Sequence, residues 1–250
     1  MNPVLDRMAN HRSIRRFADE PLDDGLVKRV VRAAQQAATS SHVQAYSLLR
    51  VRDAAARARL VELCGDQPMV ADAPAFFVVC GDAHRHRLVC ERAGRPFVAN
   101  LETFLLAVID ASLFAQNLAL GFESEGMGIC YVGGLRNRLP DVDRLLRLPP
   151  DVFPLFGLCV GKPAQEPQVR ARLPLDAVLF EDGYPEDDAL LESLAPLDAA
   201  MAEEYAARGK AGYDWSGGIA RKFARAWRDD LRAYYEAKGA RFDETRAGAS

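Results

Sequence analysis

The apolar residues of this 250-residue chain gather into short uninterrupted runs, and these runs limit the possible folds more than any other feature. AFFVVCG at 75–81 and FPLFGLCVG at 153–161 show no alternation, so each predicts a strand that is covered on both faces. AYSLLRV at 45–51 and GICYVGG at 128–134 predict two further strands, and AVLFE at 177–181 predicts a short edge or exchanged strand. Because so few short strands cannot enclose a large core without helices on both faces, the pattern predicts an α+β fold.

Helices are predicted between these strands, and only helices are predicted from about residue 187 onward. The longest, at 98–122, is strongly apolar but carries charged side chains such as Glu102 and Asp110. These groups are costly in hydrocarbon, which favours a buried central helix over a membrane span. We therefore expect one domain, 1–250, with a helical extension at 186–250. The other predicted helices are 3–10, 24–38, 53–65, 135–148, which Pro140 should break or restart, and 219–239.

The charge and cysteine content narrow the functional classes. A net charge of −3 and a pI near 5.9 argue against a general nucleic-acid binder, which needs a strongly basic surface. The five cysteines form no CxxC pair and mostly lie in apolar runs, as reduced core residues do. The N-terminal stretch MNPVLDRMANHRS has no apolar leader segment. We expect a soluble cytoplasmic protein without nucleic-acid or membrane partners.

The segment HRSIRRF at 11–17 concentrates a histidine and three arginines beside a serine. Two interpretations remain open for it: a solvated basic turn, which is the usual fate of a short charged run, or a cradle for an anion such as phosphate. Three other segments are likewise open to two interpretations: an ordinary role in a loop, turn or helix cap, or the binding of a ligand. They are TSSHVQ at 39–44, VGGL at 132–135 and RAR at 170–172.

The predicted helix at 219–239 has an apolar stripe and a basic stripe. The apolar stripe must pack against something and consists of Phe223, Trp227, Leu231 and Tyr234. The basic stripe consists of Arg221, Arg225, Arg228 and Arg232. Its charges are either ordinary solvated groups, or one or two of them reach a phosphorylated ligand.

The sequence lacks the common catalytic motifs. GMGICY at 126–131 begins like a dinucleotide fingerprint, but Tyr131 replaces the third glycine and the motif precedes a strand, so a Rossmann site is rejected. There is no GxSxG, HExxH or P-loop, and no evident nucleophile–base pair. His84 and His86 have no carboxylate or cysteine at ligand spacing, so no metal site is predicted. If the chain is an enzyme, a bound cofactor is expected to supply the chemistry.

Taken in order, six segments resemble the oxygen-insensitive NADPH nitroreductases and NADPH–flavin oxidoreductases. They are HRSIRRFADEPL, TSSHVQ, the isolated Gln67, YVGGLRN, PLFGLCVGKP and RARLP. The resemblance covers almost the whole chain, including a C-terminal helical extension typical of the NADPH-preferring group. It implies an α+β homodimer with a mostly antiparallel central sheet covered by helices. It also implies FMN bound non-covalently at the subunit interface, with NADPH as the reductant. Nitroaromatics, quinones or free flavins would then receive two electrons in a ping-pong cycle.

The resemblance also implies which residues form the site. No catalytic residue is expected, because the flavin carries the chemistry, and Arg15 is the candidate for stabilising the reduced flavin. The implied FMN-binding residues are His11, Arg12, Ser13, Arg15, Thr39, Ser40, Ser41, Gln67, Gly133, Gly134, Arg170 and Arg172. The implied NADPH-binding residues are Arg208, Arg136 and Arg228.

The chain departs from the family pattern in a few places. Thr39 and Val43 stand where serine and leucine are common. His42 replaces a more apolar residue, a change that is expected to alter the substrate face. The segment KAGYDW after Arg208 is shorter and less basic than expected, which bears on the preference for NADPH over NADH. An alternative of another class is a flavin-binding protein that stores or delivers FMN without turnover.

Overall fold

The computed structural model describes residues 2–242, which form two compact units. The first unit contains the chain as far as Pro167 together with the segment from Arg228 onward, and the second is Gln168–Trp227. The first unit holds the sheet. The second contains a 3-10 helix, Leu175–Ala177, and the helices α8 (Asp187–Ser193), α9 (Ala195–Ala207) and α10 (Trp215–Phe223).

The sheet has four strands in the order β1-β2-β4-β3, and every neighbouring pair is antiparallel. The strands are β1 (Tyr46–Val51), β2 (Ala75–Asp82), β3 (Gly128–Val132) and β4 (Val152–Gly161). They confirm the α+β prediction and four of the five predicted strands. The strand predicted at 177–181 is wrong. The segment begins at the end of the 3-10 helix Leu175–Ala177 without strand pairing, and its side chains Val178 and Leu179 are 60% and 61% exposed.

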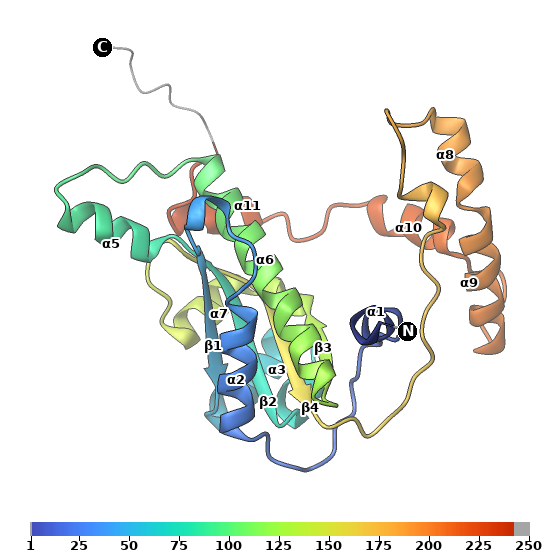
Figure 1. Ribbon diagram of the computed structural model, residues 1–250, viewed down its shortest axis with the longest axis horizontal. Helices are drawn as coiled ribbons and strands as arrows, with labels where there is room; N and C mark the ends of the chain where they lie inside the picture. The colour runs from blue at the N-terminus through green and yellow to red at the C-terminus, as the bar shows by residue number, and fades with distance from the viewer. Residues whose placement is uncertain (1, 243–250) are drawn as a thin grey trace. The chain divides into compact units, whose positions relative to one another are not determined.

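Helices cover both faces of the sheet, as the continuous apolar strands predicted. On one face lie α2 (Asp24–Ala34) and α6 (Leu101–Ser124), side by side (Figure 1). The other face packs against α3 (Ala54–Leu63), α4 (Met69–Asp72) and α7 (Leu139–Leu146). Successive residues of β2 alternate between the two clusters, with Phe77 on the α6 side and Phe76 on the α3 side.

The long helix α6 begins at Leu101 because Asn100 caps it, accepting a hydrogen bond from the Thr103 amide at 2.9 Å. In the described part of the chain it is the one helix long and apolar enough to cross a membrane. One of its faces packs in the core, as predicted. The opposite face carries an exposed apolar stripe, which was not predicted. The stripe consists of Leu101, Leu105, Ile109 and Leu113.

Proline and backbone geometry decide two further helix boundaries. The helix predicted at 135–148 is split as expected: a 3-10 turn, Gly133–Asn137, precedes α7, and Pro140 lies in the first turn of α7. The continuous helix predicted at 219–239 is wrong. It is interrupted between α10 and α11 (Leu231–Ala237), since Arg228 adopts a left-handed φ of 57°. The two predicted stripes are therefore broken. The remaining helices are α1 (Pro3–Ala9), α5 (His84–Arg92) and the 3-10 turn Ser40–His42.

Candidate functional site

The opening basic segment runs as an extended chain beside β3. Ser13 bridges to Ile129 in parallel, the Ile14 amide donates to the Ile129 carbonyl at 2.8 Å, and Phe17 bridges to Pro163. Ile14 is buried against Gly128, where a Cβ would lie 2.6 Å from the isoleucine side chain. The segment is therefore fixed by the sheet edge and is not a freely solvated turn.

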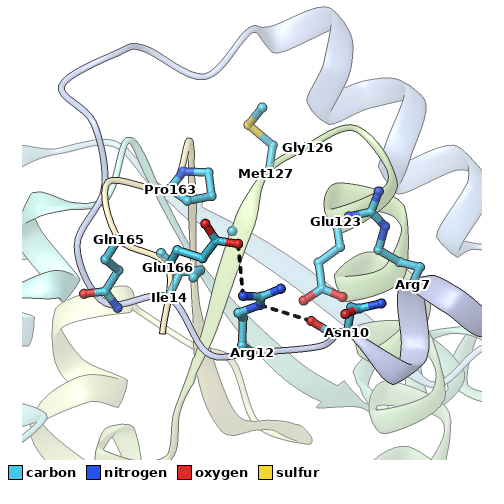
Figure 2. A pocket seen from close by; sticks show the side chains of 11 residues that line it. Arg7, Asn10, Arg12, Ile14, Glu123, Gly126, Met127, Pro163, Gln165 and Glu166 are labelled. Atoms are coloured by element: carbon cyan, nitrogen blue, oxygen red, sulfur yellow. Dashed lines mark hydrogen bonds and ion pairs between the residues drawn. The ribbon is translucent and has the colours of Figure 1, made fainter. Parts of the chain in front are cut away.

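Two arginines of this segment have different surroundings. Among residues 2–242, Arg15 has no hydrogen bond or ion pair, and its charge acts on Cys130 of β3. Burial raises the pKa of the Cys130 thiol, and the positive charge of Arg15 opposes that shift. Arg12, in contrast, donates to Glu166 at 3.2 Å (Figure 2). It also donates to the Pro167 carbonyl at 3.2 Å. Arg15 thus offers an unused guanidinium, while Arg12 is already engaged.

His11 is tied to the core by a buried acid. Its Nδ1 lies 2.6 Å from Oε1 of Glu123, a side chain near the end of α6 that is only 9% exposed. The second oxygen of Glu123 is buried without a partner among the described residues. Glu123 also lines a cavity of about 350 Å³ whose rim includes Arg7, Arg12 and Glu166 (Figure 2).

Gln67 and the double glycine after β3 pack directly on one another. The Gln67 side-chain amide donates to the Cys64 carbonyl at 2.7 Å. A Cβ at Gly134 would collide with that carbonyl and with the Gln67 amide, so glycine is required there. At Gly133 the nearest atom to a Cβ would be a guanidinium nitrogen of Arg136 at 3.6 Å, so a side-chain methyl group has room there.

The loop before β1 is organised by Asp110 of α6, a carboxylate that is 1% exposed. Its Oδ2 accepts hydrogen bonds from the Thr39 hydroxyl at 2.6 Å and the Ala45 amide at 3.0 Å, and its Oδ1 accepts one from the Ser40 amide at 3.3 Å. The Thr39 hydroxyl in turn accepts from the Gln44 amide at 2.7 Å. The hydroxyls of Ser40 and Ser41 make no hydrogen bond within the described chain, and both residues are exposed.

Two of the three predicted NADPH-binding arginines are neighbours. Arg136 donates to the Leu155 carbonyl at 2.5 Å, and Arg228 donates to the side-chain oxygen of Asn137 at 2.9 Å. Partial burial lowers the pKa of Arg228, and the nearby charge of Arg136 lowers it further. Two guanidiniums near enough for their charges to act on each other favour the binding of an anion between or beside them.

The other predicted arginines belong to the second unit. Arg208 lies 2.6 Å and Arg170 lies 3.6 Å from the same carboxylate oxygen of Glu204 on α9. Arg170 and Arg172 also line a mostly apolar cavity of about 640 Å³ with Met201 and Trp215. Glu204 therefore links one arginine predicted for the FMN phosphate with one predicted for NADPH.

In a single chain the predicted polar groups of the first unit form two separate sets. The loop at 39–45 precedes β1 and is held on the α6 face, whereas Gln67 and Gly134 lie at the end of β3 on the α3 face. The strands β1 and β3 are the two outer strands, so three interstrand spacings, about 14 Å, separate them. These sets cannot contact the same small ring system within one chain.

Three carboxylates of the site were missed from the sequence: Asp110, Glu123 and Glu204. Each lies inside a helix, and no motif spacing singles it out. A signal existed for Asp110 and Glu123, since a buried charge in a largely apolar helix needs a polar partner. Within residues 2–242, no cluster of three or more histidine, cysteine, aspartate or glutamate side chains is placed to hold a metal ion.

Known proteins resemble the chain over nearly its whole length. The model of the nitroreductase family matches residues 8–162, and that of the family's C-terminal domain matches residues 170–243. The chain is 39% identical over 245 residues to the FMN reductase (NADPH) of Bacillus subtilis (strain 168), covering 96% of this chain and 98% of that protein. It is also 39% identical over 242 residues to the oxygen-insensitive NADPH nitroreductase of Salmonella typhimurium, with the same coverage.

Similarity in structure agrees with similarity in sequence. The solved NfrA1 nitroreductase from B. subtilis superimposes with a TM-score of 0.91 at 39% identity, covering 95% of this chain and 98% of that one. These matches confirm the resemblance seen in the sequence motifs and the fold that it implied. The chain belongs to the nitroreductase family.

Proposed function

We propose that this protein is an FMN-dependent oxidoreductase that takes hydride from NADPH and passes two electrons to small planar acceptors. The acceptor classes are nitroaromatics, quinones and free flavins. One observation carries the proposal: two sets of polar groups, the loop at 39–45 and the Gln67–Gly134 pair, lie on opposite edges and opposite faces of the sheet. Names of close relatives, among them an FMN reductase and an NADPH nitroreductase, support the same chemistry.

The groups present suit an anionic, hydrogen-bonding cofactor such as FMN. The Arg15 guanidinium and the hydroxyls of Ser13, Ser40 and Ser41 have no hydrogen-bond partner among the described residues, and there is room beside the Cα of Gly133. Arginine and hydroxyl donors are what a phosphate and a flavin carbonyl require. When bound, FMN supplies the redox chemistry, accepting hydride from NADPH and passing two electrons to a second substrate.

A second copy of the chain would bring the two sets together. The exposed apolar stripe of α6, with Leu105 and Ile109 at 42% and 51% exposed, is the kind of surface that a partner covers. In a twofold dimer, the loop at 39–45 of one protomer can face the 11–15 segment and Gln67 of its partner. We therefore propose a homodimer with two composite sites.

Each set of residues has a distinct role in this proposal. Arg15 stabilises the negative charge that develops on the reduced cofactor, and Gln67 orients the ring against the Gly133 turn. Arg136 and Arg228 of the first unit bind a phosphate of NADPH, and Arg208 is a separate candidate for NADPH in the second unit. No protein acid or base is required, which agrees with the lack of a nucleophile–base pair in the sequence. Because the two substrates use one face in turn, the kinetics follow a ping-pong pattern.

A reducing, cytoplasmic location is part of the same proposal. All five cysteines are free, and four of them are buried. Reduced buried thiols are typical of proteins that are kept in a reducing compartment.

Absorbance and steady-state kinetics test the function. The purified protein is expected to carry a flavin chromophore that bleaches with NADPH under argon and recovers when a nitroaromatic is added. Initial rates at varied NADPH and acceptor should give parallel double-reciprocal lines. A protein that cannot be reconstituted with FMN would overturn the proposal. A fully flavinated protein without turnover would instead indicate storage of FMN.

A further inference from the structure

Three residues of the loop at 39–45 have a backbone conformation that residues other than glycine rarely adopt. Ser41, His42 and Gln44 have φ values of 47°, 59° and 54°, in the left-handed region that normally favours glycine. None of the three is glycine, so this conformation needs external support. Strained backbone of this kind gathers at ligand sites, where it aims side chains or amides in a defined direction.

Asp110 supplies that support from inside the protein. Its carboxylate accepts hydrogen bonds from both ends of the loop. The donors are the Thr39 hydroxyl and the Ser40 backbone amide at the start, and the Ala45 backbone amide at the end. A carboxylate that is 1% exposed is stable in the core only if its oxygens accept hydrogen bonds from nearby donors. The loop and the buried acid therefore stabilise each other.

The middle of the loop has a second anchor. Nε2 of His86, on α5, lies 2.7 Å from the Val43 carbonyl. His86 and Asp110 together form hydrogen bonds with the polar groups on the inner side of the loop. The hydroxyls of Ser40 and Ser41 remain exposed and unused within the described chain.

We propose that Asp110 is a positioning residue for the cofactor: it holds residues 39–45 in the left-handed conformation that presents Ser40 and Ser41 to FMN. This inference rests on the proposed function. Thr39 belongs to the support, because its hydroxyl donates to Asp110 and accepts from the Gln44 amide. Asp110 itself is almost fully enclosed, so it acts through the loop and does not contact the cofactor.

The ability of both carboxylate oxygens to accept hydrogen bonds matters for this role. Asp110 accepts every hydrogen bond that it makes with the loop. An ionised carboxylate only accepts hydrogen bonds, so both of its oxygens suit the donors of the loop. In Asp110→Asn the amide NH₂ group must face either the Ser40 amide or the Thr39 and Ala45 donors. Either orientation puts donor against donor and releases one end of the loop.

The experiment compares Asp110→Asn with two variants of its partner, Thr39→Val and Thr39→Ser. Asp151→Asn serves as the matched control, because Asp151 is also a buried carboxylate, paired with Arg87 at 2.6 Å and not bonded to the loop. Two readouts are used: the Kd for FMN from quenching of flavin fluorescence, and amide hydrogen exchange of residues 39–45 in the FMN-free protein.

Asp110→Asn should raise the Kd for FMN about tenfold or more, as expected for loss of a hydrogen bond to a charged group, and should speed exchange in the loop. Thr39→Val should do the same more weakly, and Thr39→Ser should behave like the wild type because it keeps the hydroxyl. Asp151→Asn should leave the Kd and the loop exchange unchanged. If Asp110→Asn does not fold, the Thr39 pair carries the test.

Three results would overturn the inference. One is wild-type FMN affinity and loop exchange in Asp110→Asn, and a second is equal loss of affinity in Asp110→Asn and Asp151→Asn. The third is equal behaviour of Thr39→Val and Thr39→Ser. Failure of the proposed function looks different, since the wild-type protein itself would then bind no FMN while the exchange comparison still reports on the loop.

Discussion

Arg15 and Arg16 are adjacent in the sequence but have different surroundings. Arg15 has no partner among the described residues and lies near Cys130, whereas Nε of Arg16 donates to the Gln165 side chain at 3.0 Å. A guanidinium without a partner among the described residues, close enough to β3 for its charge to act on Cys130, is well placed to meet an anionic cofactor. The two residues therefore form a natural pair for comparison.

Replacing Arg15 with alanine should weaken FMN binding about tenfold to a hundredfold, because a charged hydrogen bond contributes about 1.5–3 kcal/mol. Arg16→Ala removes the same charge from the neighbouring residue and should change the Kd by less than about threefold. Fluorescence titration of the FMN-free protein measures both. Equal losses for the two variants would mean that the local positive charge matters and not the specific contact.

The cysteines provide a second test at the residue scale. Burial raises the pKa of Cys64 to about 12, and it also raises the pKa of Cys80, Cys130 and Cys159. Their thiolates are therefore scarce at pH 8, and reactivity increases only as the pH rises towards these values. An aromatic disulfide reagent at pH 8 should modify Cys90 alone in the native protein and all five cysteines after denaturation. Rapid native modification of a second thiol would show that the core opens locally.

At the scale of elements, the turn after β3 depends on one glycine more than on its neighbour. Gly134 packs against the Cys64 carbonyl and the Gln67 amide, and Gly133 faces open space apart from Arg136. The turn thereby joins β3, the end of α3 and the residue predicted to hold the flavin ring. This close packing explains why Gly134 should tolerate a larger side chain less well than Gly133.

Gly134→Ala should destabilise the protein by about 1–3 kcal/mol, because the added methyl group forces the backbone and Gln67 apart. Gly133→Ala should cost less than about 1 kcal/mol, since its methyl group has room. Urea unfolding followed by circular dichroism measures the difference. If both variants have the wild-type midpoint, the contact at Gly134 relaxes without cost.

At the scale of the whole molecule, α6 connects the core to the proposed dimer interface. Its inner face packs on the sheet and carries Asp110 and Glu123, which hold the loop at 39–45 and His11. Its outer face is the exposed apolar stripe. If a second copy covers that stripe, cofactor binding and dimerisation must depend on each other.

Ile109→Glu places a charge in the centre of the stripe and should shift the protein towards monomers, because burying an unpaired carboxylate is costly. FMN should be lost with the dimer, since each site needs residues from two protomers. Lys28→Glu, on the exposed surface of α2, is the control and should remain dimeric and flavinated. Light scattering after size-exclusion chromatography, with absorbance recorded in parallel, measures both properties. A monomeric Ile109→Glu protein that retains FMN would contradict the composite site.

The sequence alone determined the strands β1 to β4, the helical cover of the sheet and the break before α7. These features follow from local patterns: uninterrupted apolar runs, helical periodicity and the position of Pro140. The same reasoning failed at 177–181 and 219–239. Apolar character does not create a pairing strand, and periodicity does not reveal the left-handed turn at Arg228.

Only the tertiary structure decided how the candidate site is assembled. Asp110 is 71 residues from Thr39 and Glu123 is 112 residues from His11, so no local pattern could pair them. The division of the polar groups between opposite edges of the sheet likewise depends on the strand order β1-β2-β4-β3. Buried charges must find partners wherever packing brings donors close, and that packing depends on contacts distant in the sequence.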